Sequence, residues 1–381
     1  MTHCSALHKI ITLVNVNNIA YSSANRQALT QNDVAADHSW TFVQRGMNFE
    51  KDLKLTGQYC YHPFNTITID SAGDVYPCVC QAWLPVSLGK IWEFESLDDI
   101  LRTARAREIQ ASILDGSYRY CDNNTCGILQ TNDLQNKISH KPDTINWINF
   151  AIDSSCNLTC PSCRKDFIFV SEGPEYELRI RIVDHIAKLI EQHTQWIKFS
   201  LSGDGDPFAS LVYRDLLSKL NVTGKQVEIE IITNGILAKT HWHKMAGVHK
   251  NIVRFKVSFD AGSEQVYNVT RRGGNWNKLL DSCRFMSKWK QKTYSSMVLT
   301  ANFVVQTANY RDMVAYVELC DQLGFDEINF QAVNDWGTFS NFKQHAVWQS
   351  SHPEHSEFLK QLQHPSLNNS KVNLTNLKDI T

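Results

Sequence analysis

The sequence reads Ile145-Asn-Trp-Ile-Asn-Phe-Ala-Ile-Asp153 and, after two intervening residues, Cys156-Asn-Leu-Thr-Cys160-Pro-Ser-Cys163. Thiolate sulfur prefers soft metal centres such as iron–sulfur clusters, zinc or copper(I). Three cysteines hold three corners of a [4Fe-4S] cube and leave one iron open, whereas a fourth cysteine would complete an electron carrier. The next cysteine is Cys283, far downstream. The spacing therefore favours a cluster with an open iron over its alternatives, a zinc knuckle or a redox-sensing thiol cluster.

Short apolar runs alternate with helical stretches after residue 145. Parallel strands need connections of helix length, so five helices joining six strands predict a parallel sheet. The expected strands cover residues 147–153, 197–202, 227–233, 252–259, 299–306 and 327–333, and the expected helices cover residues 176–193, 208–220, 239–248, 276–290 and 309–323.

The cysteine triplet, its place after the apolar run and the later Ser202-Gly-Asp-Gly-Asp-Pro207 resemble the radical S-adenosylmethionine (radical SAM) enzyme family over about residues 145–335. The resemblance implies an α/β fold, an incomplete (β/α)6 barrel, with its chemistry at the carboxyl ends of the strands. It also implies that the open iron binds the amino and carboxylate groups of SAM. An electron from the cluster would then cleave SAM, and the resulting 5′-deoxyadenosyl radical would abstract a hydrogen from the substrate.

The resemblance also implies which residues contact SAM. The turn after the second strand, Gly203, Asp204, Gly205 and Asp206, would hold the SAM amino group, although the family usually has Glu where this chain has Asp206. Further contacts with the methionine part, the ribose or the carboxylate are expected at Asn234, Ser258, Asp260 and Gln306. The family often places an aromatic residue before the third cysteine, and here that residue is Ser162.

A second group of cysteines lies in residues 59–130. The alternating Phe64–Asp70 run, a turn and a strand starting at Val75 predict a β-hairpin. The elements Gly73-Asp-Val-Tyr-Pro-Cys78 and Leu88-Gly-Lys-Ile resemble the SPASM/twitch auxiliary cluster domain, which here precedes the barrel instead of following it. The resemblance implies a second, auxiliary [4Fe-4S] cluster, with a four-cysteine zinc site as the alternative. The expected ligands are Cys60, Cys78, Cys121 and Cys126, with Cys80 as the alternative to one of them.

The expected domain organisation follows from these segments. Residues 1–58 are a polar, loosely ordered leader, residues 59–130 the auxiliary cluster domain, residues 131–144 a polar linker, residues 145–335 the partial barrel and residues 336–381 a C-terminal extension without a motif.

The composition limits the compartment and the partners. The chain of 381 residues carries 38 Lys and Arg against 39 Asp and Glu, and a net charge of -1 does not indicate a nucleic-acid partner. No run approaches the roughly 20 apolar residues that span a bilayer, so no membrane contact is expected. Eleven cysteines without a recognisable secretory signal favour metal ligation in a reducing compartment, and we expect a cytoplasmic protein.

The expected function is radical SAM chemistry that oxidatively modifies a peptide or protein. Its expected partners are SAM, that substrate and an electron donor such as a flavodoxin or ferredoxin. The peptide substrate rests on analogy with the auxiliary cluster domain. One alternative is oxidation or epimerisation of a small molecule such as a sugar. The other is a zinc-bound interaction protein without enzymatic activity.

Overall fold

The structure is a computed structural model that describes residues 53–123, 125–130, 132–136, 144–201, 203–293 and 295–380. The predicted leader therefore lies outside the described residues up to residue 52, and so do residue 131 and residues 137–143 of the predicted linker.

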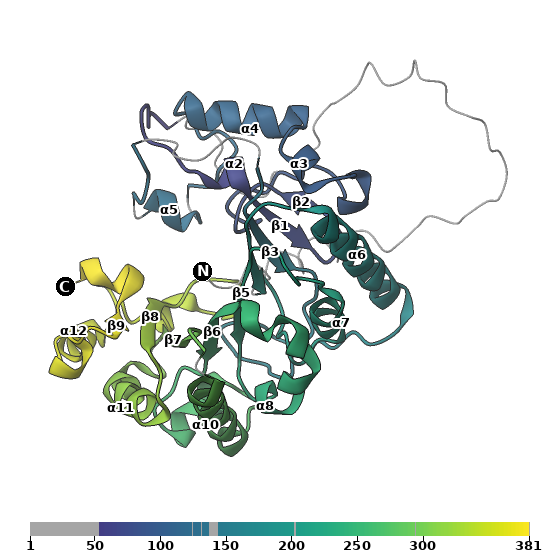
Figure 1. The fold of residues 1–381 in the computed structure, drawn as a ribbon. Coiled ribbons are helices and arrows are strands. Elements are labelled where there is room, and N and C mark those ends of the chain that lie inside the picture. The colour runs from purple at the N-terminus through teal and green to yellow at the C-terminus, as the bar shows by residue number, and fades with distance from the viewer. Residues whose placement is uncertain are drawn as a thin grey trace, which may run out of the picture.

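One open sheet of nine strands runs through the described chain in the order β2-β1-β3-β4-β5-β6-β7-β8-β9. All neighbours are parallel except β1 and β2, which form an antiparallel hairpin. Figure 1 shows the sheet curving from β1 to β9 with helices on its outer side. The predicted partial barrel is thus confirmed as a mixed α/β fold that does not close. The strands are β1 Thr66–Asp70, β2 Val75–Tyr76, β3 Trp147–Ala151, β4 Ile197–Leu201, β5 Val227–Thr233, β6 Ile252–Ser258, β7 Val298–Val305, β8 Glu327–Ala332 and β9 Val372–Asn373.

Helices provide the crossovers between the parallel strands, as the sequence predicts. In α6 the buried residues Ile182, Ile186 and Ile190 recur every four positions, which places them on one face against the sheet. The α-helices are α2 His62–Asn65, α3 Leu97–Ile100, α4 Ala104–Leu114, α5 Gly127–Gln130, α6 Gly173–Gln192, α7 Leu211–Lys219, α8 Ala238–His241, α9 Glu264–Thr270, α10 Trp276–Thr293, α11 Met313–Leu323 and α12 His355–Leu362. The 3₁₀ helices are η1 Ile91–Glu93, η2 Trp242–Asn251, η3 Tyr310–Asp312, η4 Phe342–Gln344, η5 Pro365–Leu367 and η6 Thr375–Ile380.

The hairpin differs from its prediction in extent. Phe64 belongs to helix α2 and β1 begins at Thr66, while β2 ends at Tyr76 because the following residue, Pro77, has no N–H for the ladder. The strand therefore does not continue to Cys78 and Cys80. Helices α3 and α4 lie between residues 97 and 114, after the hairpin.

The hairpin is part of the barrel sheet. Strand β1 pairs in parallel with β3 over five residues, from Thr66 opposite Trp147 to Asp70 opposite Ala151. The side chain of Asn149 on β3 donates to the backbone oxygen of Val79 at 2.9 Å. The cysteine-rich segment and the barrel therefore share one ladder of hydrogen bonds.

The inner side of the curved sheet carries polar and charged side chains. Glu230 on β5 lies 3.0 Å from Lys256 of β6 and 3.4 Å from Lys198 of β4. The indole N–H of Trp147 on β3 donates to the hydroxyl of Ser200 on β4 at 2.9 Å. The main hydrophobic core includes apolar residues of the strands together with those of helices such as α6 and α7. The interior of the partial barrel is therefore suited to a polar ligand.

No helix in the described part of the chain is both long and apolar enough to cross a membrane.

Candidate functional site

The loop that follows β3 carries the cysteine triplet. Cys156 and Cys160 are buried and Cys163 is partly buried. The N–H groups of Cys163 and Arg164 both donate to the backbone oxygen of Cys160 at 3.0 Å, which forms a tight turn around the second thiol. The N–H of Cys156 donates to the backbone oxygen of Ile168 at 2.9 Å. All three thiols are thus held on one short loop at the carboxyl end of a barrel strand.

Asp153 holds the start of this loop. Its side chain is fully buried and accepts hydrogen bonds from Arg179 of α6, from Ser210 at the start of α7 and from the N–H of Ser155. A buried carboxylate is stabilised by such charge-assisted hydrogen bonds. The strand end and two helices therefore position the cysteine loop together.

Gly203 and Gly205 lie against the same loop. A Cβ on Gly203 would come within 2.3 Å of the Cβ of Ala151, and one on Gly205 within 2.4 Å of the backbone oxygen of Asp153. Gly205 also has a φ of +67°, a conformation that glycine adopts without strain. The two glycines therefore allow the turn after β4 to pack directly onto the cysteine loop.

The Asp206 carboxylate is fully engaged within the protein. One oxygen accepts from the hydroxyl of Thr233 and the N–H of Asn234, both at 2.8 Å. The other accepts from the N–H groups of Phe208 and Ala209 at 3.0 and 3.1 Å. Burial raises the pKa of Asp206 although these hydrogen bonds oppose the shift. Asp206 thus joins the loops after β4 and β5, while Asp204 is the more exposed acid of this turn.

Asn234 connects the turn after β5 with the cysteine loop. Its amide nitrogen donates to the side-chain oxygen of Asn157 at 2.8 Å and lies 3.7 Å from the sulfur of Cys156. A donor beside a ligating sulfur orients the ligand and changes the electronic properties of the bound metal. The expectation of a SAM contact at Asn234 stays a prediction.

Two arginines that adjoin the thiols are buried. Arg271 lies 2.6 Å from Asp260 and donates to the sulfur of Cys160 at 3.8 Å. Arg164 donates to the backbone oxygen of Ser154 at 2.7 Å. Asp260 also accepts from the backbone N–H of Val304 at 2.8 Å, and its backbone has a φ of 55°. Asp260, expected to contact SAM, is therefore already paired with a cation that faces the cysteine loop.

The remaining expected contacts lie on or after the strands β6 and β7. The amide of Asn302 donates to the hydroxyl of Ser258 at 3.4 Å, and Asn329 donates to Asn302 at 3.3 Å. Gln306 is buried at the end of β7, where its N–H donates to the side chain of Asn309 at 2.8 Å. Neighbouring protein groups therefore satisfy part of the hydrogen bonding of these side chains, and the SAM contacts expected at Ser258 and Gln306 stay predictions.

Burial raises the pKa of the Cys156 thiol to about 12, and it also raises the pKa of Cys160. Arg164 opposes the shift at Cys156 and Arg271 opposes it at Cys160. Thiols must lose their protons to bind a metal. A buried thiol triplet flanked by two guanidinium groups fits a cluster that is held by thiolates and shielded from water.

The second cysteine set gathers in a small cavity. Cys60, Cys78, Cys121 and Cys126 all line it, together with Trp83 and other residues. Burial raises the pKa of all four thiols, and that of Cys60 to about 12. In the described residues no group of three or more His, Cys, Asp or Glu side chains has the arrangement of a single metal-ion site. The four thiols around one cavity fit the ligand set of an auxiliary cluster.

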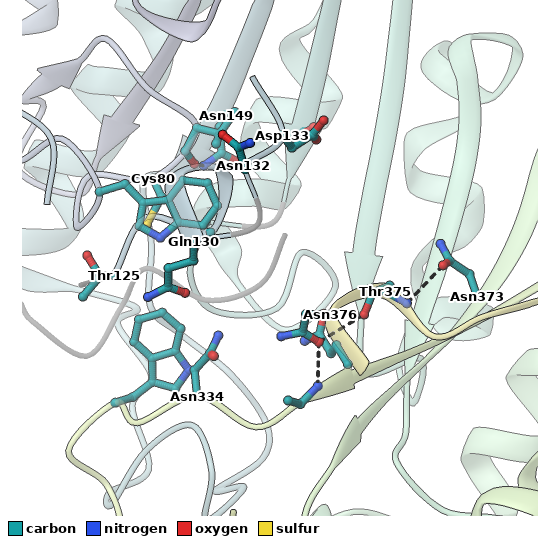
Figure 2. A pocket seen from close by; sticks show the side chains of 18 of the residues that line it. Cys80, Thr125, Gln130, Asn132, Asp133, Asn149, Asn334, Asn373, Thr375 and Asn376 are labelled. Atoms are coloured by element: carbon teal, nitrogen blue, oxygen red, sulfur yellow. Dashed lines mark hydrogen bonds between the residues drawn. The ribbon is translucent and has the colours of Figure 1, made fainter. Parts of the chain in front are cut away.

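Cys80 lines a different cavity from the other four cysteines of this segment. It lines a large cavity of about 800 Å³ in the interior of the partial barrel, and not the small cavity of the four thiols. Figure 2 shows this large cavity with Cys80, Asn149 and Asn334 among its lining residues. Because the chain bends after β2, Cys78 and Cys80 reach different cavities.

The large cavity adjoins both thiol sets. Trp83 lines it and also lines the small cavity of the four thiols. On the other side, Gln331, Asn334 and Trp336 line both the large cavity and a crevice that contains Cys163. A ligand in the large cavity therefore lies between the two sets of cysteines.

Several functional candidates escaped the sequence analysis. Arg164 directly follows the third cysteine in the sequence, and this position is the signal that could have identified it as a candidate. The C-terminal residues Asn373, Thr375, Asn376 and Lys378 line the large cavity, although no motif marks them.

Comparison with family models gives two matches. The model of the radical SAM superfamily matches residues 153–320, and the model of the SPASM iron–sulfur cluster-binding domain matches residues 60–127. A search of curated proteins finds no match.

Solved structures share low similarity with the chain. TYW1 with a lysine–pyruvate adduct bound is 16% identical, with 57% of this chain and 70% of that chain covered at a TM-score of 0.36. Native anSMEcpe with bound AdoMet is 17% identical, and the match covers 50% of this chain and 52% of that chain at a TM-score of 0.36. Streptococcus suis SuiB is 14% identical, and the match covers 62% of this chain and 45% of that chain at a TM-score of 0.35. The chain thus spans about half the length of the last two.

Proposed function

We propose that this chain, which belongs to the radical SAM superfamily and carries an N-terminal SPASM domain, is an enzyme that oxidatively modifies a peptide or protein. One observation carries the proposal: the large cavity lies between the cysteine triplet and the set of four thiols. A substrate in that cavity would lie beside both proposed cluster sites.

Cys156, Cys160 and Cys163 would hold the [4Fe-4S] cluster that binds SAM, and Cys60, Cys78, Cys121 and Cys126 the auxiliary cluster. When bound, the first cluster with SAM supplies the reductive cleavage of SAM and the abstraction of a hydrogen atom. Asn234 and Arg271 would orient Cys156 and Cys160 through the contacts to their sulfurs. The turn of residues 203–206 would shape the SAM site beside the cysteine loop.

The partners follow from this chemistry. SAM and an electron donor such as a flavodoxin or ferredoxin are part of the proposal, and so is a reducing compartment, because the cysteines of both sets are free thiols. The auxiliary site beside the cavity supports a net oxidation of the substrate over a reaction that leaves its oxidation state unchanged.

Release of 5′-deoxyadenosine tests the proposal. Anaerobically reconstituted and reduced protein given SAM should release 5′-deoxyadenosine, and Cys160→Ala should abolish the release because one corner of the cluster loses its ligand. Cys283→Ala is the matched control, since this buried cysteine lies in α10 and belongs to neither set. Equal release by wild type and Cys160→Ala would refute the enzyme proposal.

Iron content tests the two cluster sites. About eight irons per chain are expected if both clusters are [4Fe-4S]. Four irons with one zinc would assign the SPASM segment a structural zinc site instead.

A further inference from the structure

We infer that the large cavity binds an extended, uncharged stretch of polypeptide, and that the C-terminal segment 372–378 is the wall that holds it. The inference rests on the proposed function and names the substrate class and the part of the chain that selects it.

The C-terminal segment is fixed to the end of β8. Strand β9 pairs with β8, with Val372 opposite Ile328. The hydroxyl of Thr375 donates to the backbone oxygen of Phe330. The side-chain oxygen of Asn376 accepts from the backbone N–H of Ala332 at 2.9 Å. These contacts place the segment along the strand end that borders the crevice of Cys163.

Thr375 adopts a φ of 44° in this segment. A β-branched residue rarely occupies the left-handed region, and such a conformation persists only where the surroundings stabilise it. The hydrogen bonds of Thr375 and Asn376 to β8 provide that stabilisation. Hydrogen bonds to β8 therefore fix the segment in place as part of the cavity wall.

The wall presents hydrogen-bond donors to the cavity. The side-chain oxygen of Asn373 accepts from the N–H of Thr375 at 3.0 Å, and that of Asn376 accepts from Ala332. Both oxygens are thus engaged, and neither amide nitrogen has a hydrogen-bond partner among the described residues. The exposed ammonium group of Lys378 adds a charged donor. A ligand that meets this wall must offer acceptor oxygens.

The opposite wall comes from the SPASM segment. Figure 2 shows Thr125 and Gln130 in the same cavity as Asn373, Thr375 and Asn376 of the C-terminal segment. Among the described lining residues, Asp133 carries a carboxylate that balances the ammonium group of the other wall. The lining as a whole is rich in carboxamides and has no net charge, which favours a neutral ligand with both donors and acceptors.

A polypeptide backbone has this combination of donors and acceptors. In the described chain β9 ends the sheet and pairs with β8 alone, and an extended peptide can pair with such a strand edge. The cavity of about 800 Å³ is near the upper limit of small-molecule sites, about 300–1,000 Å³. Its indole rings, Trp83, Trp147 and Trp336, can take apolar side chains. A neutral sugar could use the indoles and carboxamides but not the strand edge.

The test uses the full chain under anaerobic conditions without SAM. Three probes are dialysed against it: a library of N-acetylated, C-amidated octapeptides of uncharged residues, a matched library rich in Asp, Glu, Lys and Arg, and maltotriose. We expect retention of uncharged peptides alone. Lys378→Ala should weaken the Kd of a retained peptide about fivefold or more, the effect of losing one charged hydrogen bond. Lys343→Ala, an exposed lysine outside the cavity, is the matched control and should bind as wild type.

Retention of maltotriose in place of peptides, equal retention of charged and uncharged peptides, or an unchanged Kd in Lys378→Ala would overturn the inference. The release of 5′-deoxyadenosine is measured on the same preparations. Peptide binding without that release would refute the proposed radical SAM activity and leave the peptide site supported. Release without peptide binding would refute the peptide site and leave the radical SAM activity supported.

Discussion

Arg164 combines burial, charge and contact with the cysteine loop in a single side chain. Only 7% of it is exposed, it donates to Ser154, and it lies 3.7 Å from Asp204. Burial lowers the pKa of its guanidinium group, but Cys163, Cys156 and Asp204 outweigh burial, so the net pKa is raised. The residue therefore carries a permanent positive charge beside the ligands of the proposed cluster.

Replacing Arg164 with Met should make the reduction potential of the bound cluster more negative, because a nearby positive charge stabilises the reduced cluster. The measurement is a redox titration followed by electron paramagnetic resonance. Arg164→Lys should restore most of the wild-type potential, and the exposed neighbour Lys165 provides the control Lys165→Met. Equal potentials in wild type and Arg164→Met would show that the arginine acts on loop structure alone.

At the scale of elements, Glu230 joins three barrel strands. The residue on β5 is buried, and its carboxylate contacts Lys256 of β6 and Lys198 of β4. Burial alone would raise the pKa of Glu230, but the two lysines outweigh burial and hold the pKa below its usual value. Removing one partner of a buried ion pair leaves the other charge uncompensated in the interior.

Glu230→Gln should therefore lower the free energy of unfolding by about 3 kcal/mol at pH 7, as measured by urea denaturation. The contribution of Glu230 to stability is present above its unfolded-state pKa and is lost as the pH falls through its lower folded-state pKa. Wild type should thus lose stability below about pH 4.5, and the loss should be smaller in Glu230→Gln. Glu228→Gln, on the same strand, is the control. Parallel stability curves for wild type and Glu230→Gln would contradict the prediction.

For the whole molecule, the shared sheet makes the SPASM segment and the barrel one structural unit. Strand β1 is hydrogen-bonded along β3, so separation would expose the edge of a central parallel strand. The domain boundaries predicted from the sequence stay a prediction, but they do not coincide with a break in the sheet.

Urea unfolding of the full chain should accordingly show one transition rather than two, because neither part can lose its strands without disturbing the other. Tryptophan fluorescence and far-ultraviolet circular dichroism should give coincident curves. Residues 144–381 expressed alone should aggregate or unfold at lower urea concentration than the full chain. Two separate transitions, with the fragment as stable as the full chain, would show that the segments fold independently.

Much of the fold followed from local patterns. The strands β3 to β8 and the helices α6, α7, α10 and α11 lie within a few residues of their predicted positions, because apolar periodicity reports on each element separately. The 239–248 stretch was expected to be one helix and instead divides into α8 and η2, with a non-helical residue at Met245. Propensity alone does not reveal such a break, since tertiary contacts override it.

The spacing of Cys156, Cys160 and Cys163 predicted a cluster with an open iron, and the alternation of strands and helices predicted a parallel sheet. The resemblance to the radical SAM family added the class of chemistry and the partial barrel. The tertiary structure alone decided that Cys78 and Cys80 reach different cavities, that the oxygens of Asp206 are taken by neighbouring donors, and that the C-terminal segment lines the large cavity. The physical reason is the distance along the chain between the residues that form each feature. Ligand spacing and periodicity are properties of neighbouring residues, whereas a cavity is made by residues far apart in the chain that the order of the strands brings together.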